Sequence, residues 1–438
     1  MVDLVVRGGR LVLPEGMHDA DLAVEGERIV QVGPELPGGR EEIDARGRLV
    51  LPAVVDVHVH FNEPGRAEWE GAATGSRALA AGGGTVFVDM PLNSSPCTLT
   101  AEAVDRKREA LEAASITDFA LWGGLVPGAV PEMAGMAARG VVGFKAFMCD
   151  SGLPEFPPAD DRTLETGMRE AARLGLPVAV HAESDVLVRP MADGSARDFL
   201  ASRPVAAELD AIRRALAIAA ETGASLHVVH VSSGQGVALA AEARARGVDV
   251  SIETCPHYLC FTAEDVDRLG VAAKCAPPFR AAEEQARLWA EVLNGRVDIV
   301  ASDHSPTEPR LKQGSFLTAW GGIAGVQSTL AVLLSCGHHD RGLSLERIAA
   351  LLSASPARRF KLAGKGSLAV GGHADLALVA LDEPFALEAG DLHQRHKATP
   401  YLGRRFRGRV THTIRRGEVI FNDGRITART SGRFVRPG

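Results

Sequence analysis

The strongest constraint on the fold of this chain is an alternation of strand-like and helix-like segments that repeats eight times between residues 53 and 362. The apolar runs begin about 35 residues apart, enough for a strand, a crossover helix and two loops in each repeat. They start near Val54, Thr85, Asp118, Gly143, Pro177, Leu226, Val248 and Val297. Stretches such as 209–218 fill the gaps with apolar residues three to four positions apart, which is typical of packed helices. The pattern predicts an α/β fold built on a (β/α)8 TIM-type barrel. The alternative, a doubly wound open sheet, lacks a GxGxxG motif after its first strand.

The two ends of the chain have a different texture, with short strands separated by tight turns. Strand-like segments cover 4–7, 10–13, 21–24 and 28–32 near the start, and 374–379 and 418–422 near the end. Neither half is large enough to bury a core alone, so we expect both halves to complete one β-sandwich that flanks the barrel. The expected divisions are 1–52 for the first half of the sandwich, 53–362 for the barrel and 363–438 for the second half.

Charge and composition exclude several kinds of partner. The net charge of -7 gives no overall attraction to nucleic acid or to an anionic membrane. Residues 391–438 are the exception, with 12 Lys and Arg against 3 Asp and Glu. This segment is either a polyanion-binding tail or the solvated face of a sheet. We favour the sheet, because its arginines flank strand-forming residues such as those of 410–414.

The expected compartment is the cytoplasm. The chain opens on Met1-Val2-Asp3-Leu4, without the basic and apolar regions of a secretory signal. Six cysteines at irregular spacing, in a chain without an export signal, are expected to be reduced thiols.

Residues suited to metal binding gather at the predicted ends of barrel strands, which is where function collects in this fold. His58 and His60 end the first strand, and their spacing places both imidazoles on one face of it. His181 and His230 end the fifth and sixth strands, and Asp303 follows the eighth. Taken singly, each histidine is equally compatible with a satisfied core residue, and Asp303 with a helix N-cap.

Lys145 lies in the apolar fourth strand, where a buried ammonium without a partner is costly. One interpretation is that the side chain extends out of the barrel mouth into solvent. The other is that its neutral amine has reacted with carbon dioxide, giving a carbamate whose two oxygens bridge two metal ions. The second interpretation gains weight because four histidines, an aspartate and this lysine all fall at strand ends of the same predicted barrel.

The placement of these six residues resembles the cyclic amidohydrolases of the amidohydrolase superfamily, and the resemblance covers essentially the whole chain. It implies two divalent metal ions, zinc being the expected metal, and a carboxylated lysine. By this resemblance His58, His60 and Asp303 hold the more buried ion, His181 and His230 hold the more exposed one, and Lys145 bridges them as a carbamate. The resemblance also implies a homotetramer that acts on a small cyclic amide.

Within this family the chain looks most like the allantoinases. The segments 58–66, 68–71, 89–94, 145–149 and 319–323 carry this likeness. Dihydroorotases usually have an arginine and an asparagine at the positions of Asn62 and Ala276, where both contact a substrate carboxylate. Their absence here favours a neutral ring. Hydantoinases have a tyrosine where this chain has Asp150, a residue that also departs from the allantoinase pattern.

The expected reaction is therefore the hydrolytic opening of allantoin to allantoate by a hydroxide held between the two metal ions. Asp303 would act first as general base and then as general acid. The alternatives are a dihydroorotase or other hydantoinase-type cyclic amide hydrolase, or a catalytically dead relative. The expected substrate contacts are Asn62, Asn93, Ser151, Ala276 and Gly321. Glu183 is expected either to orient a ligand or to be structural, and His304 either to contact substrate or to brace its loop.

Overall fold

The computed structural model describes residues 1–438 and contains the expected barrel. Its strands are β6 (Val54–Val59), β7 (Gly84–Asp89), β8 (Asp118–Leu121), β9 (Gly123–Gly124), β10 (Phe144–Phe147), β11 (Val178–His181), β12 (Leu226–Val228), β13 (Val250–Thr254) and β14 (Ile299–Val300). Neighbouring strands pair in parallel from β6 to β8 and from β9 to β14, and β9 continues directly from β8. The ring closes where Val59 pairs with His304, just beyond β14. The (β/α)8 prediction is confirmed.

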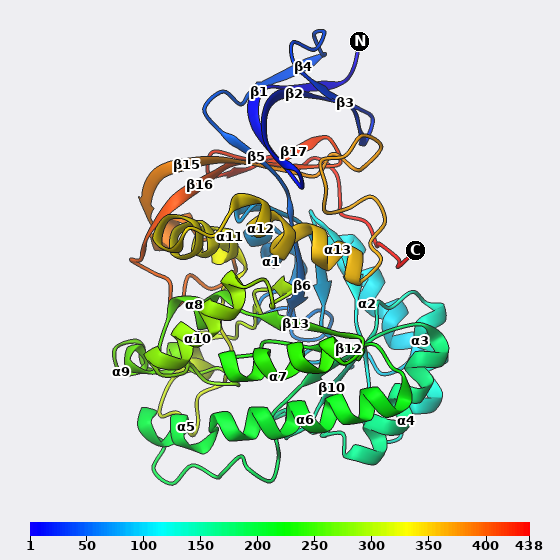
Figure 1. Ribbon diagram of the computed structural model, residues 1–438, viewed down its shortest axis with the longest axis vertical. Coiled ribbons are helices and arrows are strands. Elements are labelled where there is room, and N and C mark those ends of the chain that lie inside the picture. Colours follow the sequence, from blue (N-terminus) through cyan, green and yellow to red (C-terminus); the bar gives the residue numbers. More distant parts are fainter.

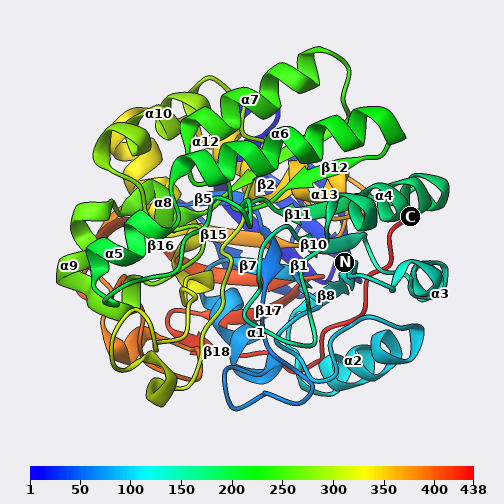
Figure 2. The same ribbon diagram turned by 90° about the horizontal axis from the view of Figure 1, so that it is seen from below.

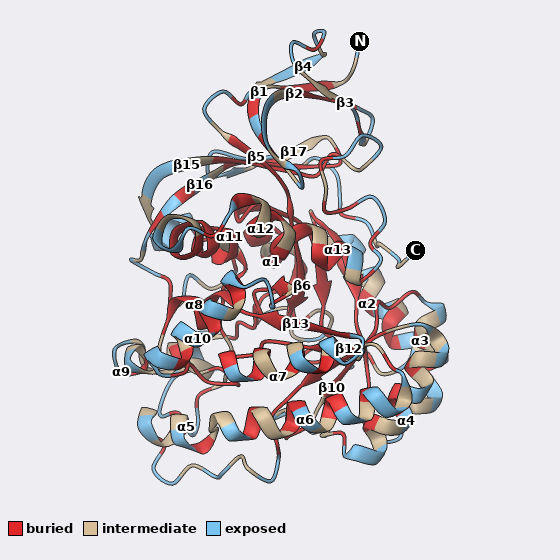
Figure 3. Ribbon diagram, in the orientation of Figure 1, coloured by how far each residue is buried: buried red, intermediate tan, exposed pale blue.

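Helices surround these strands, as Figure 2 shows from the end opposite the flanking sheet. The longer ones are α1 (Ala72–Ala81), α2 (Ala101–Ala114), α4 (Asp161–Leu174), α6 (Val205–Thr222), α7 (Gly234–Ala245) and α10 (Ala282–Leu293). The shorter ones are α3 (Met133–Ala138), α5 (Ala196–Ser202), α8 (Pro256–Cys260), α9 (Val266–Leu269), α11 (Thr329–Val332), α12 (Leu345–Ala349) and α13 (Ser355–Arg359). Two π-helical segments, Leu333–His339 and Ala350–Ala354, continue α11 and α12. The barrel strands are buried and the outer faces of the helices are exposed (Figure 3).

Both ends of the chain contribute to one nine-stranded sheet above the barrel in Figure 1. Its strands are β1 (Leu4–Leu13), β2 (Gly16–Glu25), β3 (Arg28–Gly33), β4 (Glu41–Asp44), β5 (Leu49–Pro52), β15 (Leu376–Ala386), β16 (Arg405–Arg415), β17 (Glu418–Asn422) and β18 (Arg425–Ile426). β5 pairs with β1 on one side and with β15 on the other, so this strand joins the two halves. Apolar side chains of both halves share one buried cluster, among them Val6, Val50 and Leu376. The main core of this sheet is therefore formed by both halves together.

Three arginines of β16 lie on a solvated face, as the alternation predicts, whereas Arg415 at the end of the strand is buried. Arg405, Arg407 and Arg409 are exposed, whereas Phe406 and Gly408 between them are buried. Arg407 and Arg409 pair with exposed carboxylates of β15 at 3.2 and 3.0 Å. No helix has the length and apolarity that crossing a membrane requires.

A buried ion network ties the flanking sheet to the barrel. The ammonium of Lys365 lies 2.7 Å from carboxylate oxygens of both Asp118 in β8 and Asp375 just before β15. Arg416 contacts the other oxygen of Asp118. Burial opposes ionisation of Asp118, but the two cations outweigh it and lower the pKa of this carboxyl. The seam between sheet and barrel is therefore held by paired charges as well as by apolar contact.

Candidate metal centre

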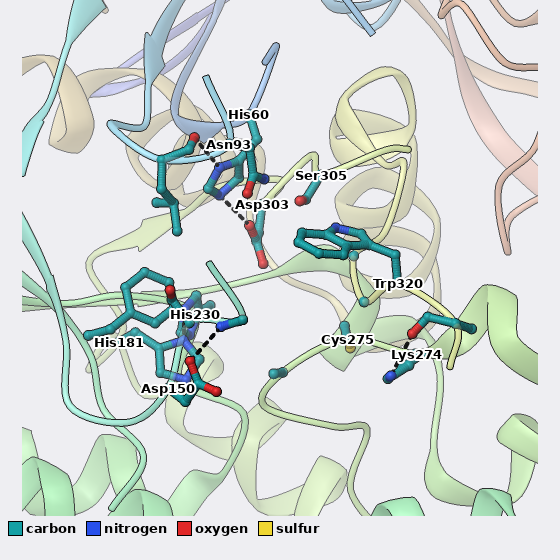
Figure 4. Close-up of a pocket in the computed structure, with 18 of the residues that line it drawn as sticks. His60, Asn93, Asp150, His181, His230, Lys274, Cys275, Asp303, Ser305 and Trp320 are labelled. Atoms are coloured by element: carbon teal, nitrogen blue, oxygen red, sulfur yellow. Dashed lines mark hydrogen bonds and ion pairs between the residues drawn. The ribbon is translucent and has the colours of Figure 1, made fainter. Parts of the chain in front are cut away.

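A cavity of about 370 Å³ opens at the carboxyl ends of the barrel strands. Five of the six predicted metal ligands line it: His58, His60, His181, His230 and Asp303. In Figure 4, His60 and Asp303 lie on one side of the cavity, and His181 and His230 lie together on another. Lys145 is fully buried in β10, which pairs with β11, the strand that ends at His181.

The first group consists of His58, His60 and Asp303. The Nε2 atoms of His58 and His60 lie 3.3 and 3.4 Å from the same oxygen of Asp303, and the three ligand atoms are all within 4.8 Å of one another. Because Nδ1 of His58 donates to Glu253 at 2.8 Å, its Nε2 lone pair faces the group. The arrangement presents two imidazole nitrogens and a carboxylate to one point, a donor set that suits a divalent transition metal.

The second group consists of His181 and His230, whose Nδ1 and Nε2 atoms lie 3.0 Å apart. Nε2 of His181 contacts Glu183 at 2.8 Å, which leaves Nδ1 of His181 facing His230. The His230 ring lies 5.4 Å from that of His58, so the two groups adjoin. Glu183 in turn pairs with Arg203 at 2.5 Å. Glu183 therefore orients His181, one of the two roles expected from the sequence.

Lys145 has the environment that carbamate formation requires. Its Nζ is buried and has no hydrogen-bond partner, and it lies 4.9 Å from the centre of the Phe147 ring. Burial lowers the pKa of this amine to about 7, although the nearby carboxylates of Glu253 and Asp303 oppose the shift. A large share of the side chain is therefore neutral at neutral pH, and its hydrogen-bonding capacity is unused.

The other side chains of the site have the protonation states that metal binding requires. Burial lowers the pKa values of His60, His181 and His230, so their imidazoles are neutral. Burial works against ionisation of Asp303, but His58 and His60 outweigh it and lower the pKa of this carboxyl to about 2. Neutral imidazoles, an ionised carboxylate and an orphaned buried amine together fit a divalent-metal site.

Two residues that form the site, Asp303 and His230, have left-handed backbone conformations, with φ of 44° and 38°. Such angles are strained for residues other than glycine and cluster at functional sites. His304, next in the chain, is fully buried, and its Nδ1 accepts hydrogen bonds from the backbone of Gly325 and Val326 at 3.1 and 3.3 Å. Of its two expected roles, His304 therefore has that of bracing the loop.

Glu253 in β13 is the main contributor to the site that the sequence did not reveal. Its carboxylate accepts from Nδ1 of His58 at 2.8 Å, from Nε2 of His227 at 3.1 Å and from the backbone amide of His230 at 3.1 Å. It is fully buried and contacts one member of each histidine group. The available signal was a single acidic residue in a strand that is otherwise free of charged side chains.

Four of the five predicted substrate contacts line the cavity: Asn93, Ser151, Ala276 and Gly321. Asn62 is not among the lining residues; it is buried, and its amide donates to the carbonyl of Pro306 at 3.4 Å. Asp150, whose role was open, lies on the wall, and one of its oxygens accepts from the backbone of Gly152 at 2.9 Å.

The wall also includes residues that were not predicted from the sequence as site residues. They are Arg203, which reaches the cavity from the end of α5, and Lys274 and Trp320. The ammonium of Lys274 donates to the carbonyl of Ala319 at 2.6 Å, so it ties the loop of Trp320 to the cavity wall (Figure 4). No regular spacing in the sequence connects these loop residues.

Comparison with known proteins gives consistent matches over the full chain. The profile of the amidohydrolase family matches residues 49–420. A protein from Solibacter usitatus named allantoinase is 60% identical over 445 residues, covering 100% of this chain and 97% of its own length. One of the same name from Rubrobacter xylanophilus is 57% identical, covering 99% and 98%. Among solved structures, the L-hydantoinase (dihydropyrimidinase) from Arthrobacter aurescens superposes with a TM-score of 0.96 at 33% identity, covering 100% of both chains.

Proposed function

The chain belongs to the amidohydrolase family, and we propose that it is an allantoinase, which opens the ring of allantoin by hydrolysis to give allantoate. As a member of this family it is a hydrolase of cyclic amides and uses divalent metal. The observation that carries the proposal is the convergence of His58, His60, His181, His230 and Asp303 on one cavity, with the orphaned amine of Lys145 buried near the carboxylates of Asp303 and Glu253. The names of its relatives and the neutral character expected of the ring direct the choice to allantoin.

We propose that His58, His60 and Asp303 hold one divalent ion, that His181 and His230 hold a second, and that zinc is the metal. When bound, a pair of such ions polarises the amide carbonyl and lowers the pKa of water toward neutrality. Lys145 would bridge the two groups after its neutral amine adds to carbon dioxide, which forms an N–C bond and releases one proton. Support for the bridge comes from the unused hydrogen-bonding capacity of its Nζ and from its lowered pKa.

Asp303 is our candidate for the general base and acid. It is 8% exposed, lies on the cavity wall and is ionised at neutral pH, so it can accept a proton from the attacking water. The same carboxyl can then return that proton to the departing ring nitrogen. Contacts of one carboxylate oxygen with Nε2 of His58 and of His60, at 3.3 and 3.4 Å, hold the carboxylate in place.

Substrate recognition rests on the polar wall of the cavity. We propose Asn93, Ser151, Ala276 and Gly321 as contacts, since all four line the cavity. Asn62 supports the choice of a neutral substrate in another way, because at this position the chain has no cation able to bind a carboxylate. We propose no direct contact between Asn62 and the substrate.

A dihydroorotase or hydantoinase activity is the second candidate, favoured by the likeness to the Arthrobacter aurescens hydantoinase.

We also propose that the chain divides at residues 52/53 and 362/363, that four copies assemble, and that the protein works in the cytoplasm. The first division is supported by β5, which ends at Pro52 and is separated by one residue from β6, the first strand of the barrel.

The deciding experiment compares hydrolysis of allantoin, dihydroorotate and unsubstituted hydantoin by zinc-loaded protein. We expect the highest kcat/KM with allantoin and a loss of at least about two orders of magnitude in Asp303→Asn, the scale of general acid–base catalysis. Fastest turnover of dihydroorotate or hydantoin would overturn the choice of substrate. Near-normal turnover by Asp303→Asn that retains its metal would overturn the role of Asp303.

A further inference from the structure

Two of the six cysteines meet outside the cavity, although 75 residues separate them in the sequence. Cys260 is the last residue of α8, and Cys336 lies in the π-helical segment Leu333–His339. These two segments pack against each other, and the two thiols adjoin. All six cysteines are unpaired, so the protein holds this pair as a dithiol.

A guanidinium group lies against the pair. Nη2 of Arg404, just before β16, is 3.6 Å from Sγ of Cys336. The same guanidinium lies over the ring of Phe261, 5.4 Å from its centre, and forms no ion pair with a carboxylate within 4 Å. Its positive charge therefore acts on sulfur, the atom whose ionised form is the nucleophile in thiol oxidation.

The environment distinguishes Cys336 from the other five cysteines. The hydrogen bond from Cys260 and the charge of Arg404 lower the pKa of Cys336 to about 6, against the effect of burial. Burial raises the pKa of every other thiol, those of Cys97, Cys149, Cys255, Cys260 and Cys275. At neutral pH Cys336 is thus the principal thiolate, and an un-ionised thiol lies beside it.

We propose that Cys260 and Cys336 are an oxidisable dithiol that a hydroperoxide converts into a disulfide. The Cys336 thiolate attacks the terminal oxygen of the hydroperoxide, the O–O bond breaks, and a sulfenic acid and an alkoxide or hydroxide form. The Cys260 sulfur then displaces the sulfenic oxygen as water. The two thiols lose two electrons and two protons, and the hydroperoxide is reduced to an alcohol or to water.

Access and placement fit this chemistry. Cys336 is 4% and Cys260 is 9% exposed, so a small oxidant is favoured over a bulky one. The disulfide would link α8, which follows the strand carrying Glu253, to the segment beneath the flanking sheet. That segment already contacts β16, where the Ser335 hydroxyl donates to the Arg407 carbonyl at 3.0 Å. The link would therefore join the barrel rim to the seam under the sheet.

The test treats the full-length, metal-loaded protein with hydrogen peroxide and follows intact mass and the cysteine-containing peptides. We expect a loss of roughly 2 Da, a cross-linked peptide pair containing Cys260 and Cys336, and recovery of both thiols with dithiothreitol. Cys336→Ser should give no such loss, whereas Cys97→Ser, which removes a buried cysteine elsewhere, should behave as the wild type.

A second variant tests the role of the guanidinium without removing a sulfur. Arg404→Gln should slow disulfide formation at pH 7 by about tenfold, because the thiolate fraction of Cys336 falls. Arg404→Lys should restore most of the rate. The proposal fails if a different cysteine pair forms first, if Cys336 goes to the sulfinic acid without pairing, or if Arg404→Gln oxidises at the wild-type rate.

Discussion

Replacing Glu253 with glutamine removes the negative charge that connects the two histidine groups while keeping the size of the side chain. The carboxylate accepts from His58 at 2.8 Å, from His227 at 3.1 Å and from the backbone of His230 at 3.1 Å. Glutamine keeps one acceptor oxygen, which serves His58 and His230. Its amide nitrogen then faces His227, which must move its proton to Nδ1 to accept the new hydrogen bond.

The expected effect follows from the difference between charged and neutral hydrogen bonds. A hydrogen bond to a charged group contributes about 1 kcal/mol more than a neutral one, and two histidine contacts lose that difference. The sum of about 2 kcal/mol corresponds to roughly 30-fold. Because Glu253 accepts from Nδ1 of His58 and so turns Nε2 toward His60 and Asp303, we expect most of the loss as weaker metal binding, within the range seen for such carboxylates.

The assay is competition for zinc with a chelator at fixed pH, together with kcat/KM of the reloaded enzyme. Glu208→Gln is the matched control, because this buried carboxylate accepts from the Ser232 backbone and hydroxyl at 2.7 and 2.8 Å and contacts no candidate ligand. It should lower the free energy of unfolding and leave zinc affinity unchanged. Zinc affinity of Glu253→Gln within about twofold of the wild type, or equal losses in both variants, would refute the reasoning.

Three further predictions concern the bridge, the cavity wall and the seam. Carbon dioxide adds only to the neutral amine of Lys145, whose pKa is lowered to about 7. The carbamate signal in ¹³C NMR of apoprotein with labelled bicarbonate should therefore grow from pH 6 to pH 8. A signal that is absent, or that falls as the pH rises, contradicts the assignment. Gly322→Ala should raise the KM and lower the Tm, because Gly322 has a φ of 127° and an added Cβ would overlap the carbonyl of Ser305. Gly321→Ala is the control for stability: the nearest atom to its added Cβ would be 3.9 Å away, so its Tm should stay at the wild-type value. Lys365→Met leaves the buried carboxylate of Asp375 without its cation, so the free energy of unfolding should fall by about 3–5 kcal/mol, as measured by denaturant titration. A loss below about 1 kcal/mol would show that the ion network contributes little to stability.

The sequence located the barrel strands closely because their apolar runs are nearly continuous. The run predicted from Val54 begins there, and the run expected from Val248 begins at Val250. Strand alternation also placed His58 and His60 on one face. These features depend on local periodicity, which one chain displays without help from the rest of the molecule.

Asn62 and Glu253 show where that reasoning stops. Asn62 lies two positions after His60 and would share its face if the strand continued, but β6 ends at Val59 and Asn62 has a φ of 63°, so the chain turns away. Glu253 acts on His58 across 195 positions, and such a contact exists only after the barrel closes. The pairing of Cys260 with Cys336 is of the same kind: tertiary geometry creates it, and no sequence spacing marks it.

The place of β5 between β1 and β15 has a consequence for biosynthesis. β5 leaves the ribosome more than 300 residues before β15, its second hydrogen-bonding neighbour, and all four of its residues are buried in the finished fold. Throughout that interval the nascent chain carries an open, apolar strand edge, the surface on which β-aggregation begins. When the last strands leave the ribosome, β15 pairs with β5 and covers this open edge. Polypeptides that end before residue 376 should therefore be bound by chaperones or degraded by proteases.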